Sequence, residues 1–275
     1  MPASPPSITP WRSIDAGDYQ DVPRSVTAMA KEFSGGSTTG PHSHTRGQLI
    51  YAVTGSMRVR TAQGVWPLPA RRALWVPPGV EHAVVMLGDV SMRTLYLAAD
   101  AASQLSGECC VLEVSNLLRE LILSLTAEPI EYALEGRSGQ IAALILTELA
   151  LAAHIPLHIP WPQDRRLQAV CLAIVKQPGL RRTVDDWGHE VGASGRTLIR
   201  LFQSELGLNY HEWVQQVRLA DALGRLSMGQ SIARIASELG YRSPSAFAAM
   251  FRRTLGASPH QYLNQAASNA TAGAA

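Results

Sequence analysis

The 275-residue sequence has few cysteines, no long apolar run and almost no net charge. Its three cysteines, the adjacent Cys109 and Cys110 and the separate Cys171, form neither a disulfide framework nor the spacing of a zinc site. The most apolar run, residues 141–153, is too short to span a membrane and contains Glu148. The first residues, MPASPPSITPW, lack the basic start and apolar centre of a secretion signal. We therefore expect a cytoplasmic protein that is neither exported nor inserted in a membrane.

The small net charge of +2 hides a difference between the two parts of the chain. Residues 163–263 hold 13 Lys and Arg against 8 Asp and Glu, a net charge of +5, which leaves −3 for all other residues. A polyanion should therefore bind at the C-terminal part. The near-neutral total argues against a non-specific architectural DNA protein, which would bind mainly through its charge.

The C-terminal part contains one short pattern twice, at residues 183–202 and 231–251. In each copy a Ser or Thr that can cap a helix opens a short helix, and a glycine follows for the turn. A second Ser then opens another helix, which ends at Phe202 or Phe251. This pattern predicts two helix-turn-helix units joined by a long helix over residues 210–226. Two such units can enter grooves about 34 Å apart on one side of DNA.

The second helix of each unit needs an apolar face for its own core and leaves the opposite face for DNA. Because a guanidinium can bond bidentately to guanine, Arg196 and Arg200 are the main candidates for base readout. The second unit offers fewer hydrogen-bonding groups, and its arginines can contact phosphate. The predicted DNA-binding residues are Arg196, Thr197, Ile199, Arg200, Gln203, Ser243, Ser245, Ala248, Ala249, Arg252 and Arg253.

The ending GYRSPSAFAAMFRRTLGASPHQYL, together with the first unit, resembles the DNA-binding domain of the AraC/XylS family of bacterial transcription regulators, over about residues 163–263. The resemblance implies a sequence-specific regulator that binds double-stranded promoter DNA and acts on RNA polymerase. It also implies a homodimer that responds to a small-molecule effector. We accordingly expect no enzymatic activity.

The N-terminal part, residues 25–97, consists of short β-prone runs broken by Gly and Pro, which is typical of a sandwich or barrel. Residues 36–97 resemble the two sequence motifs of the cupin barrel, which is a jelly roll. The residues that carry this resemblance are Gly40, His42, His44, Gln48, Gly55, Pro77, Gly79 and His82. In that family the motifs bring His and carboxylate ligands together around a divalent metal. Here Gln48 stands where the usual Glu would be, and a neutral amide oxygen is a weaker ligand than a carboxylate.

Three interpretations of these histidines are open. They can be polar groups hydrogen-bonded to the barrel, ligands of a divalent metal such as Zn, Ni, Fe or Mn, or direct contacts to an organic effector. No cofactor is certain, and a metal would be held by His42, His44, Gln48 and His82. The candidate effector-binding residues are His42, His44, Arg46, Gln48, Trp66, Trp75 and His82.

The alternative function is a metal-dependent cupin enzyme that carries a DNA-binding appendage. Fold alone does not exclude it, because cupin barrels serve both purposes. The neutral Gln48 and the absence of a second acid/base pair near the histidines argue against catalysis.

Together these patterns predict an α+β protein with an N-terminal cupin-like β-barrel, following helices and a C-terminal all-α domain. An apolar stripe that includes Ile141, Leu144 and Ile145 in the intervening helices fits a buried core and a subunit interface equally well. The expected segments are an N-terminal arm (1–23), an effector-sensing barrel (24–110), a helical dimerisation or linker region (111–155), a Pro-rich linker (156–164), a DNA-binding domain (165–264) and a disordered tail (265–275).

Overall fold

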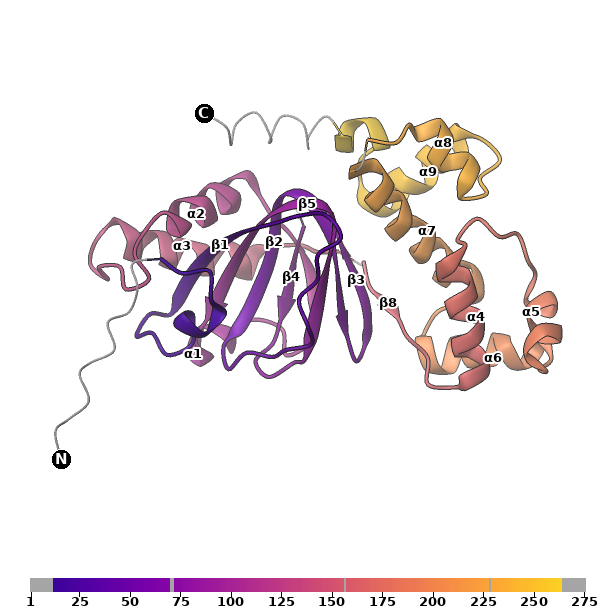
Figure 1. Cartoon of the computed structure of the whole chain (residues 1–275), viewed down its shortest axis with the longest axis horizontal. Coiled ribbons are helices and arrows are strands. Elements are labelled where there is room, and N and C mark those ends of the chain that lie inside the picture. The colour runs from indigo at the N-terminus through magenta and orange to yellow at the C-terminus, as the bar shows by residue number, and fades with distance from the viewer. Residues whose placement is uncertain (1–11, 70–71, 156, 228, 264–275) are drawn as a thin grey trace.

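The computed structural model describes residues 12–69, 72–155, 157–227 and 229–263. An antiparallel sheet lies between helices α2 and α3 on one side and the group α4 to α9 on the other (Figure 1). This α+β organisation confirms the predicted fold class. The strands are β1 (Val26–Phe33), β2 (Gly47–Thr61), β3 (Gly64–Leu68), β4 (Arg72–Val76), β5 (His82–Leu97), β6 (Cys110–Glu113), β7 (His154–Ile155) and β8 (Ile159–Pro160). The helices are η1 (Ala16–Tyr19), α1 (Ala99–Ala102), α2 (Asn116–Thr126), α3 (Arg137–Leu151), α4 (Arg165–Lys176), α5 (Val184–Val191), α6 (Gly195–Leu206), α7 (Tyr210–Ser227), α8 (Ile232–Glu238) and α9 (Pro244–Leu255).

The sheet follows the order β1-β5-β2-β4-β6-β7, and β3 pairs with both β2 and β8. Strand β2 changes partner along its length, from β4 at its start to β3 at its end, while it stays paired with β5. Register shifts on either side of Thr54 and the left-handed Gly55, with φ +79°, mark the bend. The bend curls the sheet around its own interior.

Both faces of the sheet are buried. Because side chains alternate along a strand, Ile50 joins an interior cluster with Leu74, whereas Leu49 and Tyr51 point to the opposite face. Helices α2 and α3 cover that opposite face, and Ile145 of α3 is fully buried there. The apolar stripe predicted over residues 141–153 thus packs partly on the sheet, while Leu144 stays 40% exposed.

The structure differs from the sequence analysis at both ends of the predicted barrel. Strand β6 extends the sheet beyond residue 110 into the segment expected to be helical, because Val111 and Leu112 pair with β4. Within the expected N-terminal arm, Tyr19 and Val22 are buried in the interior cluster, so residues 12–23 pack on the barrel. Residues 1–11 and the expected tail from residue 264 lie outside the described residues.

The C-terminal helices begin where the sequence predicts caps. The side chain of each cap accepts a hydrogen bond from the backbone N–H of the residue three positions later, and these caps are Thr183, Ser194, Ser231 and Ser243. Helix α7 connects the two helix-turn-helix units, as expected (Figure 1). No helix in the described ranges combines the length and apolarity that crossing a membrane requires.

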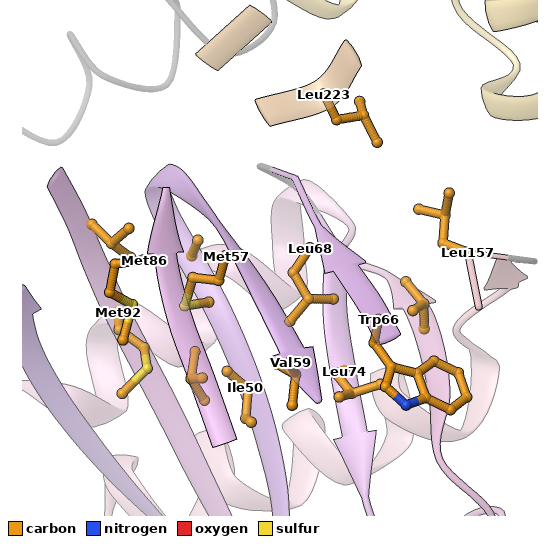
Figure 2. Packing of buried hydrophobic residues seen from close by; sticks show 14 of the residues in the cluster. Ile50, Met57, Val59, Trp66, Leu68, Leu74, Met86, Met92, Leu157 and Leu223 are labelled. Atoms are coloured by element: carbon orange, nitrogen blue, oxygen red, sulfur yellow. The ribbon is translucent and has the colours of Figure 1, made fainter. Parts of the chain in front are cut away.

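The linker strand β8 and the connecting helix α7 attach the C-terminal helices to the barrel. The linker strand β8 pairs with β3, and the Trp213 indole of α7 donates a 2.9 Å hydrogen bond to the Pro160 carbonyl. Further along α7, Leu223 belongs to the same apolar cluster as Met57 and Leu68, and it extends toward the strand ends that carry them (Figure 2). The linker and α7 therefore attach the DNA-binding helices to the sheet at two places.

Candidate effector site and DNA-binding face

Three histidines converge inside the barrel. His42 and His44 lie on the segment before β2, and His82 opens β5. One ring nitrogen of each lies within 4.8 Å of the others. The backbones of His42 and His82 bond to each other in both directions, and the Gly79 N–H donates to the His44 carbonyl at 2.8 Å. The turn before β5 thus fixes the position of the two predicted motifs relative to each other.

The hydrogen bonds of two imidazoles determine which nitrogen is free. Nδ1 of His42 lies 2.7 Å from the Gly40 carbonyl, and Nδ1 of His82 lies 3.0 Å from the Val80 carbonyl. A carbonyl only accepts, so each Nδ1 carries the proton and, in the neutral ring, Nε2 keeps its lone pair. A backbone carbonyl that orients a ring in this way is the usual outer partner of a metal-binding histidine.

Several polar atoms at this place are buried without a hydrogen-bond partner among the described residues: His44 Nε2, His82 Nε2 and Gln48 Oε1. An unpaired buried polar atom costs about 1–3 kcal/mol. Two of these atoms belong to histidines whose ring nitrogens converge, and Gln48 lines the same cavity as His44. Burial, together with the neighbouring His42 and His82, lowers the pKa of His44 to about 4, and burial also lowers the pKa of His82. Both rings are therefore neutral near pH 7, the state in which imidazole binds a metal.

A cavity of about 500 Å³ opens beside the histidines. Its wall includes His42, His44 and Gln48, and the ring of Tyr96 lies 5.1 Å from that of His44. This volume is in the range that holds a small organic ligand. The remaining wall residues are Ile14, Asp15, Ala16, Met29, Lys31, Phe33, Thr39, Ile50, Val84 and Met92.

Four predicted effector residues do not line this cavity. His82 adjoins His42 and His44, with ring centroids 4.4 Å and 5.6 Å from theirs, but it is not part of the wall. Trp75 is buried on the opposite face of the sheet, where its indole donates to the Ser106 carbonyl. Trp66 stacks on His158 beside the linker, with ring centroids 4.0 Å apart. Arg46 is buried and donates its guanidinium hydrogens to the backbone carbonyls of residues 20, 22 and 24, which holds the N-terminal segment on the barrel.

The sequence analysis missed the cavity residues that β1 supplies. Met29, Lys31 and Phe33 alternate along β1 and therefore share the face that lines the cavity. The period of two was visible in the sequence and could have identified them. Tyr96 gave no comparable signal, because it lies in the continuously buried end of β5.

Helix α6 carries the first predicted DNA-binding face. Arg196, Ile199, Arg200 and Gln203 are exposed, and Ile199 is 55% exposed although it is apolar. Thr197 is half-buried, and its N–H and hydroxyl both bond to the capping Ser194. The opposite side of the helix buries Leu198, Phe202 and Leu206 in the core of this unit. This helix therefore has the two faces that groove binding requires.

Helix α9 carries the second face. Ser245, Ala249, Arg252 and Arg253 are exposed, and Ala248 is half-buried. The hydroxyl of Ser243 caps the helix by accepting from the Ala246 N–H. Phe247, Met250 and Phe251 form its buried side.

The two arginines on α6 differ in their ion pairing from several other arginines of the C-terminal helices. Arg225 and Arg234 both pair with Glu238, and Arg182 pairs with Glu190. Among the described residues, no carboxylate pairs with Arg196 or Arg200. Their charges face solvent without compensation, as expected of groups that meet a polyanion.

Comparison with known families gives matches over most of the chain. Residues 26–177 match the AraC-like ligand binding domain, and residues 187–265 match a helix-turn-helix domain. The transcriptional regulator NimR of Escherichia coli is 30% identical over 226 residues, which are 82% of each chain. The chain belongs to the AraC family of transcription regulators. This AraC-family protein accordingly has an N-terminal ligand-binding domain and a C-terminal helix-turn-helix DNA-binding domain.

Other similarities cover less of the chain or are more distant. RipA of Corynebacterium glutamicum is 30% identical over 103 residues, which are 38% of this chain and 31% of RipA. The structure of ToxT from Vibrio cholerae with a bound unsaturated fatty acid covers 87% of this AraC-family protein and 95% of ToxT, at 12% identity and a TM-score of 0.37.

Proposed function

We propose that this AraC-family regulator reads promoter DNA mainly through Arg196 and Arg200 and is controlled by a small molecule in the barrel cavity. We further propose that His42, His44, His82 and Gln48 hold a divalent metal there. The observation that carries the metal proposal is the convergence of three imidazoles at a place where atoms of His44, His82 and Gln48 are buried without a partner among the described residues. In the first interpretation of these histidines, hydrogen bonding to the barrel, the same atoms would have partners.

The donor set fits a metal of intermediate softness. Three imidazole nitrogens and one amide oxygen suit Zn, Ni, Fe or Mn better than Ca or Mg, which prefer oxygen ligands. When bound, such an ion would offer a fixed positive charge to a ligand in the adjacent cavity of about 500 Å³. His42 and His82 would present Nε2, because their Nδ1 atoms donate to carbonyls.

Metal binding is tested on tag-free full-length protein that has been treated with a chelator and dialysed. We expect one equivalent of Zn²⁺ to bind, measured by titration calorimetry and elemental analysis. His82→Ala should lower the affinity at least tenfold. His154→Ala, which removes an exposed histidine outside the cavity, should leave the affinity unchanged. Wild-type protein that takes up no metal would refute the metal site and leave direct contact with the effector as the role of these histidines.

The DNA proposal rests on the two exposed arginines of α6, which form no ion pair among the described residues. It also rests on the exposed face of α9, which offers fewer hydrogen-bonding groups to the bases. Helix α9 offers two alanines and one serine to the bases, so we assign it mainly to phosphate contacts through Arg252 and Arg253 and to the shape of the groove. Selection from random duplexes at physiological salt should therefore return one element rich in guanine and a second, less specific element one helical turn away. Recovery of duplexes with no sequence preference would contradict this assignment.

We also propose that the protein acts in the cytoplasm as a homodimer on promoters served by RNA polymerase and has no catalytic role. The dimer contact is assigned to α2 and α3, on the observation that Leu117, Leu144 and Leu151 stay exposed on these two helices. Analytical ultracentrifugation of the full chain and of Leu144→Glu tests this assignment. A dimer that is equally stable in both would place the contact elsewhere.

A further inference from the structure

The donor atoms around the proposed metal are all neutral, and this bears on what the cavity binds. An imidazole that binds a metal does so as a neutral ring, and Gln48, which lines the cavity with His42 and His44, contributes an amide where a carboxylate would have brought a negative charge. A divalent ion held by these side chains keeps its full double charge in a partly buried place, and uncompensated charge there is costly.

The acidic group on the described cavity wall does not compensate for that charge. Asp15 is exposed, and its side chain accepts the Gly17 N–H at 2.9 Å as the cap of η1. The cavity contains a further positive charge instead. Lys31 is half-buried on the wall, its Nζ donates to the Ile14 carbonyl at 3.1 Å, and no carboxylate among the described residues forms an ion pair with it.

Most of the remaining wall residues are apolar, and Thr39 and Tyr96 add hydroxyl groups. Met29, Phe33, Ile50, Val84 and Met92 surround the same space. A ligand that fills a cavity of about 500 Å³ therefore meets hydrocarbon on most of its surface and positive charge from the proposed ion and from Lys31.

We propose that the effector is a small organic carboxylate with an apolar body, whose anionic group supplies the negative charge that this donor set lacks. This inference rests on the metal proposed above. It assigns a specific consequence to Gln48: the residue weakens metal binding in the empty protein and leaves the charge of the ion to be balanced by the effector.

The test uses full-length protein loaded with Co²⁺, whose visible absorption changes with its ligands, in a buffer of non-coordinating anions. The probes are hexanoate and hexanamide, which have nearly the same shape and differ in charge. We expect hexanoate to change the Co²⁺ spectrum saturably and hexanamide to bind at least tenfold more weakly.

Variants distinguish a charge effect from a general loss of structure. Gln48→Glu should bind Co²⁺ more tightly and hexanoate at least tenfold more weakly, two changes in opposite directions that misfolding does not produce. Lys31→Met should weaken hexanoate binding severalfold. Its control, Arg60→Met, removes one positive charge from an exposed position on β2 and should bind hexanoate as the wild type does.

The outcomes separate this inference from the metal proposal. If Co²⁺ binds but hexanoate leaves its spectrum unchanged, or both probes bind equally, the carboxylate assignment is wrong and the metal site stands. A Gln48→Glu protein that binds hexanoate as tightly as the wild type would likewise overturn the role of charge. If Co²⁺ does not bind at all, both proposals fail.

Discussion

Replacement of Gly224 by leucine should weaken the packing of helix α7 on the barrel and with it the coupling between the barrel and the DNA-binding helices. This residue is buried on α7 where the helix meets the barrel, next to Leu223, which is 2% exposed. A Cβ atom at Gly224 would lie 3.3 Å from Cδ1 of Leu87 on β5, closer than an ordinary van der Waals contact. Strand β5 begins at His82, so a proposed metal ligand and Leu87 lie five positions apart on the same strand.

The magnitude follows from packing. One methyl group meets the flexible end of a leucine, so Gly224→Ala should be accommodated and should gain up to about 1 kcal/mol from helix propensity. Gly224→Leu adds three further carbons at the same place, and overpacking of this kind costs about 1–3 kcal/mol. Because α7 is helical in both arrangements, the gain in propensity does not offset this cost. We expect about 1–3 kcal/mol against the docked arrangement, or roughly a 5- to 150-fold change in the ratio of docked to undocked protein.

Two measurements on the full-length protein test this prediction. Small-angle scattering should give a larger radius of gyration for Gly224→Leu than for the wild type and Gly224→Ala. The ratio of DNA affinities with and without Zn²⁺ should approach one in the leucine variant, because a ligand changes DNA binding only through states that it distinguishes. A leucine variant with the wild-type radius and the wild-type ratio would refute the claim that this contact couples the domains.

Three further predictions concern DNA, pH and the linker. Arg200→Ala should cost about 1–3 kcal/mol on the selected duplex, or about 5- to 150-fold in Kd, measured by fluorescence anisotropy; an equal loss on random DNA would make Arg200 a phosphate contact. The pKa of His44 is about 4 when folded and near its ordinary 6.5 when unfolded, so the unfolded metal-free chain takes up the proton first. Its urea midpoint should hence fall as pH drops from 6.5 toward 4, and a midpoint that rises over this window would contradict the burial of His44. Trp213→Phe removes the hydrogen bond to the Pro160 carbonyl and should cost about 1 kcal/mol in urea unfolding, while an unchanged midpoint would show that this contact does not hold the linker.

The DNA-binding helices could be read from the sequence because their signals are local. A cap such as Ser194 or Ser243 acts within three residues of its position, and the glycines of the turns adopt left-handed backbone, as Gly192 does at φ +66°. The spacing of buried and exposed residues in α6 follows from the helical repeat alone. No contact distant in sequence is needed to place these elements.

The barrel cavity was only partly predictable, because which residues line it depends on the face of the sheet to which each side chain points. All five residues of β4 are buried, so no alternation of polarity shows that Trp75 points away from the interior. Arg46 satisfies its charge with backbone carbonyls of the N-terminal segment, an arrangement that leaves no pattern in the sequence. The spacing of His42, His44 and His82 did indicate residues that meet, since their motifs specify the local turns.

The most direct test of the account measures the affinity of the full-length protein for its selected duplex with Zn²⁺ bound and after chelation. We predict that removal of the metal changes the wild-type Kd at least fivefold and leaves the Kd of His82→Ala unchanged, since the variant has lost a metal ligand. Equal wild-type affinities in both states, with metal binding confirmed in the same sample, would contradict control of DNA binding from the histidine site.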